Sequence, residues 1–357
     1  MEKLLEELKV LPASWLRDSC SCQDCRHQGN GQRLGSVLEL PDAIEVTGMS
    51  EMSGIITVEF SDGHRGTMNL KELESMRNIP IDTRALSSKI LWDASDGTFP
   101  SFNWVDYLED RQVMRRALTQ IQTHGYCIIR GVPTESGAVL DVIKSFGFVR
   151  VTNYGELFDV RVEADPNNLA FTSLAIAPHT DNPYRNPVPT IQLLHCLETT
   201  VEGGLSGLVD GFLVAKKLLE LDPKSYELLS TTNFLFKYEN ATTTLESHSA
   251  VIELGAQHQV VGIRWNDRSI SPPLNPENAD RVFEAMRAFA RIANDPDLVV
   301  EFRLEPGDCV IFDNTRLLHS RTAYESSGRR HLQGAYADLD SLHSSLSVLN
   351  RTMHVYI

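Results

Sequence analysis

The sequence lacks any stretch of about 18 consecutive apolar residues, the length that a helix needs to cross a bilayer. It also lacks a recognisable signal peptide. Residues 1–7 are acidic and amphipathic, whereas a signal peptide begins with basic residues and continues with an apolar run. These absences predict a cytoplasmic protein with no membrane partner.

An excess of basic residues is missing as well. The 33 Lys and Arg residues are outnumbered by 48 Asp and Glu residues, giving a formal net charge of −15. General nucleic-acid binding depends on neutralising phosphates with Lys and Arg, so this balance excludes that class. The chain also has no glycine-rich phosphate loop and no βαβ alternation, which argues against a doubly wound nucleotide-binding fold.

Cysteine is scarce, with six in 357 residues, so the protein is not a disulfide scaffold. Cys127, Cys196 and Cys309 lie in apolar runs and are expected to be buried small hydrophobic residues. The other three are Cys20, Cys22 and Cys25, which cluster near the N-terminus.

The composition is that of a globular protein, with 42% hydrophobic and 23% charged residues. Its length suits two domains of unequal size. Residues 1–70 are rich in turns, residues 71–100 form a connector, and a longer pattern starts at Phe102.

Short strands predominate in the second part of the chain, with a few helices outside them. Periodicity predicts helices at residues 1–10, 105–123, 136–146, 211–221 and 278–294. Apolar runs bounded by turn residues predict strands at residues 53–60, 126–131, 190–196 and 309–312. The pattern predicts a mostly β fold with flanking helices, an antiparallel sandwich or jelly roll of roughly 250 residues.

One short pattern suits a metal site. In His179-Thr180-Asp181 the histidine and aspartate are two residues apart, so on a strand both side chains point to the same face. A distant histidine on a neighbouring strand, His319, would complete a facial triad with open coordination positions. Taken alone, the pattern is also compatible with three unrelated polar residues.

The surroundings of His319 strengthen the metal interpretation. A turn and a buried strand precede it at residues 306–314, and Arg330 follows on what we expect to be the adjacent strand. An arginine there can bind a carboxylate through two hydrogen bonds at the inner end of the barrel. An iron centre that uses a 2-oxo dicarboxylic acid requires such a triad and such an arginine.

Further motifs follow one another in a single order along the chain. They are Trp15-Leu16-Arg17-Asp18-Ser19-Cys20, Asn153-Tyr154-Gly155, Asp165-Pro166-Asn167-Asn168, Gln192-Leu193-Leu194-His195-Cys196, Gly203-Gly204-Leu205-Ser206, Val209-Asp210-Gly211-Phe212 and Asp313-Asn314-Thr315-Arg316-Leu317-Leu318-His319. From Trp15 to Leu349 the chain resembles the γ-butyrobetaine/trimethyllysine hydroxylase branch of the iron(II)- and 2-oxoglutarate-dependent dioxygenases. The 2-(trimethylammonio)ethylphosphonate dioxygenases are one candidate group within it.

The resemblance implies a small zinc-binding α+β domain with its connector at residues 1–95, followed by a double-stranded β-helix (jelly-roll) catalytic domain at residues 96–357. It implies Fe(II), 2-oxoglutarate, O2 as co-substrate and structural Zn(II). The iron ligands that it implies are His179, Asp181 and His319.

For 2-oxoglutarate, the resemblance implies that Arg330 binds the distal carboxylate and that the Ser206 hydroxyl lies beside it. Serine in a glycine-rich turn is also common for backbone reasons alone. For zinc, it implies a set of three cysteines and one histidine, namely Cys20, Cys22, Cys25 and His64. His27 is the rival fourth ligand, although it lies very near the cysteines in the sequence.

The family holds a trimethylammonium group in an aromatic cage, because that group has no N–H and is attracted to the face of a π system. The matching positions are Tyr154, Phe158, Phe171 and Tyr336. Any one of these aromatic residues could equally be part of the core.

The anionic end of the substrate needs donors, and the expected ones are Asn168, Asn182, Arg264 and Asn266. On a continuous strand Arg264 and Asn266 would project to the same face. The alternative for Arg264 is an ion pair with an acidic neighbour.

These expectations describe an enzyme that hydroxylates an unactivated C–H bond of a small trimethylammonium zwitterion. The donor-rich anion site favours 2-(trimethylammonio)ethylphosphonate, giving its 1-hydroxy product in organophosphonate catabolism, over γ-butyrobetaine, giving carnitine. Trimethyllysine ranks third because its amino-acid end needs acidic partners too. A non-catalytic jelly-roll binding protein is the alternative from another class, and we also expect a homodimer.

Overall fold

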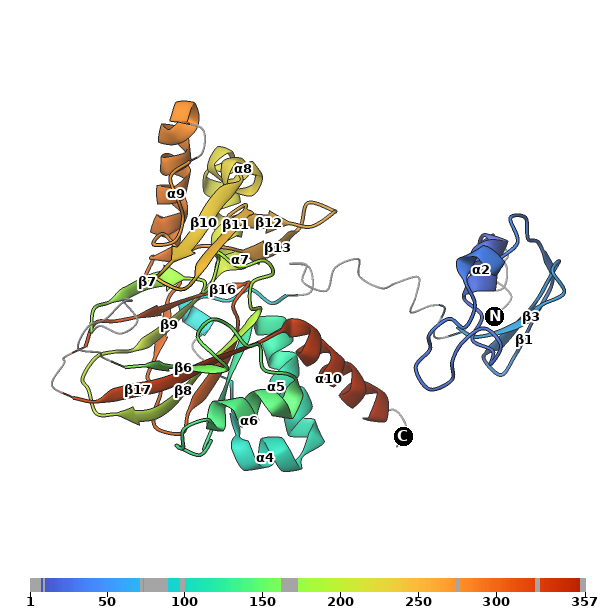
Figure 1. The fold of residues 1–357 in the computed structure, drawn as a ribbon, viewed down its shortest axis with the longest axis horizontal. Helices are drawn as coiled ribbons and strands as arrows, with labels where there is room; N and C mark the ends of the chain where they lie inside the picture. The colour runs from blue at the N-terminus through green and yellow to red at the C-terminus, as the bar shows by residue number, and fades with distance from the viewer. Residues whose placement is uncertain are drawn as a thin grey trace. The chain divides into compact units, whose positions relative to one another are not determined.

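A computed structural model describes residues 8, 10–70, 73, 89–96, 100–161, 173–273, 276–324 and 328–353 (Figure 1). The chain divides into two compact units, Met1–Ile81 and Asp82–Ile357. Most of the helix expected at residues 1–10 and most of the connector lie outside the described residues. No helix in the described ranges has the length and apolar character needed to span a membrane.

The N-terminal unit is built on a three-stranded antiparallel sheet. Its elements are α2 (Ala13–Asp18), η1 (Val37–Glu39), β1 (Val46–Met52), β2 (Ile55–Phe60) and β3 (Arg65–Asn69). Every second residue of β2 is buried, so Ile56, Val58 and Phe60 face a small core with Leu16 and Met68.

The strand expected at residues 53–60 begins at Ile55 instead. Ser53 and Gly54 both have a positive φ, 55° and 80°, and they form the turn between β1 and β2. The prediction was therefore correct for the strand and wrong for its first two residues.

The larger unit contains two sheets of the expected jelly roll. The first has six strands in the order β4-β5-β15-β8-β17-β6 and the second has four in the order β14-β9-β16-β7. All pairings within them are antiparallel except that of β4 with β5.

The strands of the two sheets are β4 (Ser101–Asn103), β5 (Tyr126–Arg130), β6 (Leu157–Val160), β7 (Ile176–His179), β8 (Ile191–Thr199), β9 (Ser206–Asp210), β14 (Val300–Phe302), β15 (Cys309–Asp313), β16 (Leu317–Arg321) and β17 (Arg330–Ala337). Two further hairpins are formed by β10 (Phe234–Glu239) with β11 (Thr244–Ser249) and by β12 (Ile252–Leu254) with β13 (Val260–Ile263).

Apolar side chains from both sheets meet in one buried cluster, which includes Ile128, Leu208, Phe312 and Leu332. This cluster forms the inside of the sandwich. A fold that is mostly β with flanking helices is thereby confirmed.

The helices pack outside the sheets in two groups (Figure 1). Around the six-stranded sheet lie α4 (Trp104–Glu109), α5 (Arg111–His124), α6 (Ala138–Phe146) and α10 (Leu339–Met353). With the two hairpins pack α7 (Gly211–Leu221), α8 (Pro223–Thr231) and α9 (Ala279–Ala293), while η3 (Ala94–Asp96) and η5 (Pro276–Asn278) are single turns.

The helix expected at residues 105–123 is two helices. Asp110 has extended backbone angles, and its carboxylate accepts the Gln112 amide at 2.7 Å, so it ends α4 and caps α5. Gly125 ends α5 in the left-handed conformation, as the sequence indicated.

Two helices of the larger unit were missed, although each carries a signal. Asp222 caps α8, and Pro223 is its first residue, which is a common start of a helix. Leu339, Leu342 and Leu346 follow helical spacing and are buried in α10. The expected burial of Cys127, Cys196 and Cys309 is confirmed, since all three are fully buried.

Candidate functional site

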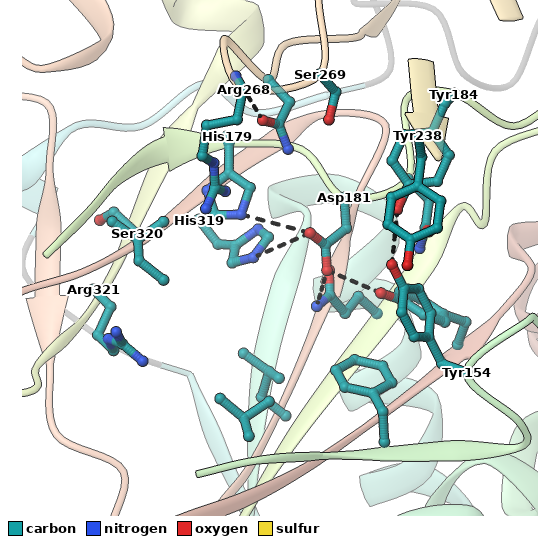
Figure 2. Close-up of a pocket in the computed structure, with 18 of the residues that line it drawn as sticks. Tyr154, His179, Asp181, Tyr184, Tyr238, Arg268, Ser269, His319, Ser320 and Arg321 are labelled. Atoms are coloured by element: carbon teal, nitrogen blue, oxygen red, sulfur yellow. Dashed lines mark hydrogen bonds and ion pairs between the residues drawn. The ribbon is translucent and has the colours of Figure 1, made fainter. Parts of the chain in front are cut away.

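A cavity of about 450 Å³ opens in the larger unit (Figure 2). Several expected site residues line it, namely Tyr154, Phe158, His179, Asp181, Asn182, Ser206, Asn266, His319, Arg330 and Tyr336. Arg264 does not, and Asn168 and Phe171 lie outside the described residues.

Three ligand-type side chains meet at one wall of the cavity. His179 on β7 and His319 on β16 are directly paired residues of neighbouring antiparallel strands, and their ring centroids are 4.1 Å apart. Asp181 Oδ1 lies 3.5 Å from His179 Nε2 and 3.9 Å from His319 Nε2. The three ligand atoms are close enough to share one ion.

Asp181 is held from two sides. The Asn314 side chain accepts from the Asp181 amide at 2.7 Å and donates to its carbonyl at 2.9 Å. Gln192 Nε2 and the Tyr336 hydroxyl donate to Asp181 Oδ2 at 2.8 and 2.9 Å. Oδ1 is therefore the oxygen that faces the histidines.

The protonation states of this group suit a metal. Burial by itself raises the pKa of Asp181, but the two histidines and the Tyr336 hydroxyl outweigh it, and the pKa lies well below its ordinary value. Burial lowers the pKa of His319 to about 3, so its ring is neutral at pH 7. His179 Nδ1 donates to the Ala177 carbonyl at 2.9 Å, so Nε2 is the ring nitrogen that faces Asp181.

A set of two imidazoles and one carboxylate, in which hydrogen bonds from Gln192 and Tyr336 orient the carboxylate, fits iron(II). The residues present in the cavity therefore fit the metal that the resemblance implies.

A basic region lies at one end of the cavity. Arg330 begins β17 and is 8% exposed, and burial lowers the pKa of its guanidinium to about 10. Among the described residues, no carboxylate lies within ion-pair distance of Arg330. Ser206, buried at the start of β9, also lines this region. An arginine without a carboxylate partner among the described residues, in a cavity that a serine hydroxyl also lines, fits the distal carboxylate of 2-oxoglutarate.

Aromatic side chains form another wall. Tyr154, Phe158 and Tyr336 were expected there, and the rings of Phe158 and Tyr336 stack with centroids 5.2 Å apart. Phe158 lies across Gly334 on the paired strand β17, where an added Cβ would come within 2.2 Å of its ring. The absence of a side chain at Gly334 allows the Phe158 ring to lie against the backbone of β17.

Two further tyrosines, which the sequence did not indicate, belong to this wall. Tyr184 and Tyr238 stack with centroids 5.0 Å apart, and the Tyr184 hydroxyl is 3.0 Å from that of Tyr154 (Figure 2). Tyr184 follows the metal motif closely, but Tyr238 comes from the β10–β11 hairpin, far along the chain. Only the folded hairpin brings it to the cavity.

The predicted role of Arg264 in the cavity is wrong. Its Nη2 pairs with Glu253 Oε1 at 2.8 Å, and its Nη1 donates to the Ser247 hydroxyl at 3.0 Å. The strand ends at Ile263, so the alternation that would place Arg264 and Asn266 on one face does not apply. The acidic neighbour considered from the sequence binds Arg264 instead.

Polar side chains beside the aromatic wall include two of the expected amides. Asn182 is buried with a φ of 55°, and its Nδ2 has no hydrogen-bond partner among the described residues. Asn266 donates to the Thr180 carbonyl at 3.3 Å and accepts the Arg268 amide at 3.2 Å. Arg268 and Ser269 line the cavity too and were not anticipated.

The N-terminal unit holds a second candidate metal site. Cys20, Cys22, Cys25 and His64 come together, with His64 Nε2 at 3.4, 3.9 and 3.5 Å from the three sulfurs in that order. Tetrahedral zinc with ordinary bond lengths places nitrogen and sulfur roughly 3.6 Å apart, so the donors fit zinc. His27 is outside this group.

Two charged residues hold the cysteine cluster. Arg17 donates to Cys25 Sγ at 3.2 Å and to Asp62 Oδ2 at 2.9 Å, while Asp62 Oδ1 accepts the His64 amide at 2.9 Å. They link Cys25 to the turn that carries His64.

Two family models match the chain. The model described as taurine catabolism dioxygenase TauD, TfdA family matches residues 82–336. The model described as gamma-butyrobetaine hydroxylase-like, N-terminal, matches residues 6–69.

Relatives match over nearly the full length. Gamma-butyrobetaine dioxygenase of Pseudomonas sp. (strain AK-1) is 32% identical over 94% of this chain and 90% of that protein. The Homo sapiens protein of the same name is 31% identical over 97% and 92%. Trimethyllysine dioxygenase of Meyerozyma guilliermondii is 28% identical over 94% and 89%.

Solved structures share the fold. The non-heme iron oxygenase OrfP, in complex with Fe and alpha-ketoglutaric acid, has a TM-score of 0.51 at 12% identity, over 68% of this chain and 94% of that one. PvcB from Pseudomonas aeruginosa has a TM-score of 0.50 at 20% identity, over 69% and 89%.

The first prediction concerns the triad. Asp181→Ala should abolish turnover, because it removes one of the three ligands. Loss of a residue that only orients a ligand weakens metal binding by roughly 10- to 100-fold, so this variant should lose more iron affinity than that. Iron content and succinate release are measured together, with exposed His248→Ala as the matched control. Wild-type iron binding by the Asp181 variant would contradict the assignment.

The second prediction concerns the cysteine cluster. His64→Gln should reduce zinc from about one equivalent per chain to near zero and lower the melting temperature, because structural zinc contributes directly to folding. His27→Gln, exposed and outside the cluster, should keep its zinc. Equal zinc in both variants would show that His64 is not a ligand.

Proposed function

We propose that this chain, which belongs to the TauD, TfdA family of iron(II)- and 2-oxoglutarate-dependent dioxygenases, hydroxylates a short substrate with a trimethylammonium group at one end and a carboxylate at the other. The compound that best fits this description is γ-butyrobetaine, whose hydroxylation gives carnitine. The names of its relatives support this choice of substrate class. The proposal places iron on His179, Asp181 and His319.

The observation that carries the proposal is the aromatic wall. It consists of Tyr154, Phe158, Tyr184, Tyr238 and Tyr336. The hydroxyls of Tyr154 and Tyr184 bond to each other, and that of Tyr336 bonds to Asp181. The polar atoms are therefore occupied, and the ring faces that are not used in the two stacked pairs remain for a cation. A cation without N–H groups is the ligand that such faces suit best.

Acidic side chains near the wall are already engaged. Glu239 lines the cavity, but its carboxylate is 2.8 Å from Lys237 Nζ. The Asp181 carboxylate faces the two histidines with one oxygen and accepts hydrogen bonds with the other. The wall therefore attracts a cation through rings rather than through a carboxylate, which favours a methylated ammonium over a primary amine.

The other end of the substrate requires donors. The buried Nδ2 of Asn182 has no partner in the described part of the chain, and such a donor costs free energy until an acceptor arrives. A carboxylate of the substrate would provide that acceptor. An amide carries no charge, so it suits a singly charged carboxylate.

When bound, iron(II) is the centre at which dioxygen and 2-oxoglutarate react, giving succinate, CO2 and one hydroxyl group on the substrate. The protein contributes position: the wall holds the cation, Asn182 holds the anion, and together they determine which carbon faces the metal. Tyr336 belongs to both parts, since its ring lies in the wall and its hydroxyl orients Asp181.

A second candidate substrate is 2-(trimethylammonio)ethylphosphonate. Arg264, which favoured it in the sequence, is bound to Glu253. One other observation supports it: Arg268 lines the cavity, and no described residue accepts a bond from its guanidinium. A phosphonate carries more negative charge than a carboxylate and would gain more from an arginine.

The third prediction tests the proposed function. γ-Butyrobetaine should support succinate release coupled to its own hydroxylation. Its isostere 5,5-dimethylhexanoate, in which a neutral tert-butyl group replaces the trimethylammonium group, should bind about 5- to 30-fold more weakly, because it lacks the cation–π attraction. Tyr238→Leu should remove most of that preference. Tyr226→Leu, on α8 outside the cavity, is the control and should keep it.

Failure of γ-butyrobetaine and the phosphonate to stimulate succinate release would refute the proposed substrate class. An unchanged preference in the Tyr238 variant would show that this ring does not contact the cation.

The fourth prediction separates the two substrates. If the phosphonate is bound through Arg268, Arg268→Ala should lower its kcat/KM by roughly 10- to 100-fold, because a charge-assisted hydrogen bond is lost. γ-Butyrobetaine should then lose much less. Equal losses of kcat/KM for the two compounds, or a higher kcat/KM of the wild-type enzyme for γ-butyrobetaine, would leave γ-butyrobetaine as the proposed substrate.

A further inference from the structure

Two arginines stack on one tyrosine ring at the basic end of the cavity. The guanidinium carbons of Arg321 and Arg330 lie 5.0 and 5.6 Å from the ring centroid of Tyr324. Both arginines line the cavity. Figure 2 shows Arg321 on the opposite side of Asp181 from Tyr154, Tyr184 and Tyr238. Arg321 therefore lies away from the aromatic wall.

The two arginines come from different sheets. Arg321 ends β16 of the four-stranded sheet, directly opposite Ser206 on β9. Arg330 begins β17 of the six-stranded sheet. Their convergence at Tyr324 is thus produced by the closing of the sandwich and not by sequence spacing.

Holding these two cations together is costly. Arg321 is 6% exposed and Arg330 is 8% exposed. Burial and, next to it, the charge of Arg321 lower the pKa of Arg330 to about 10. Two like charges in a poorly hydrated place repel each other, and a bound anion relieves that repulsion.

Both side chains are in position before any ligand arrives. Arg321 Nη2 donates to the Leu174 carbonyl at 2.7 Å. Gly204 passes so close that an added Cβ would lie 3.2 Å from both Arg330 Nε and the Tyr324 ring. Tyr324 and the loop at Gly204 therefore restrict Arg330, so little further ordering is needed when an anion binds.

We propose that Arg321 acts with Arg330 on the distal carboxylate of 2-oxoglutarate, Tyr324 being the ring over which both guanidinium groups lie. Arg321 is then a second determinant of selectivity for dicarboxylic over monocarboxylic 2-oxo acids. This inference rests on the proposed co-substrate site. It does not depend on which compound is hydroxylated.

The test is an anaerobic titration of the iron-loaded protein, following the charge-transfer absorbance of the chelated 2-oxo acid. The two probes are 2-oxoglutarate and 2-oxopentanoate, which has a methyl group in place of the distal carboxylate. Arg321→Met should weaken 2-oxoglutarate about 10- to 100-fold and leave 2-oxopentanoate within about 3-fold of wild type. Arg321→Lys, which keeps the charge but not the planar group, should give a smaller selective loss.

Arg303→Met is the matched control. Arg303 contributes positive charge at Arg330, but its guanidinium donates to the carbonyls of Val201 and Gly203, and it does not line the cavity. It should bind both acids as wild type does. If Arg303→Met weakened 2-oxoglutarate binding as much as Arg321→Met does, the proposal would be overturned. The net positive charge of the region would then explain both losses of affinity.

Unchanged 2-oxoglutarate affinity in Arg321→Met, or equal loss of both acids, would also overturn it, the latter indicating a structural role. The Lys variant decides the question if the Met variant does not fold. Because the titration uses no hydroxylated substrate, its result is independent of whether γ-butyrobetaine is turned over.

Discussion

The buried ion pair between Arg316 and Asp210 is the interaction on which the catalytic unit depends. Both side chains are fully inaccessible, with Arg316 Nη2 2.7 Å from Asp210 Oδ2. The same guanidinium donates to the carbonyls of Thr123 and Ile90, at 2.7 and 2.6 Å. The guanidinium thereby connects β9, the C-terminal end of α5 and the segment around Ile90, which precedes η3. Removing one partner of such a pair leaves an uncompensated buried charge, which is strongly destabilising.

The position of this pair also explains the metal site. Arg316 immediately precedes β16, and three residues later that strand carries His319 opposite His179 on β7. Asp210 also caps α7 by accepting the Phe212 amide. The pair thus determines where β16 starts relative to β9, and the register that follows brings the two histidines together. Stability of the core and geometry of the site have a common origin.

In the cavity, unlike at the Arg316–Asp210 pair, some buried polar groups have no partner among the described residues. Asn182 Nδ2 is buried without an acceptor in the described ranges, and Arg330 has no carboxylate there. Such groups cost free energy in the empty protein and recover it on binding. Where protein partners were present, as for Arg264 and Glu253, the side chain is structural. This distinction is the basis on which we propose Asn182 and Arg330, but not Arg264, as binding residues.

The sequence by itself determined the elements and sites whose information is local or belongs to a long ordered series of motifs. The strands around β5 and β15, the turn at Gly125, the His179–Asp181 pair and the compact cysteine group are of this kind, because short-range periodicity, turn chemistry and ligand spacing specify them. Tertiary structure alone decided that Tyr184 and Tyr238 join the wall, that Arg264 turns to Glu253, and that Arg321 meets Arg330 over Tyr324. The physical reason is that a side chain's partner depends on strand ends, hairpin placement and the closing of two sheets, which residue spacing along one strand does not encode.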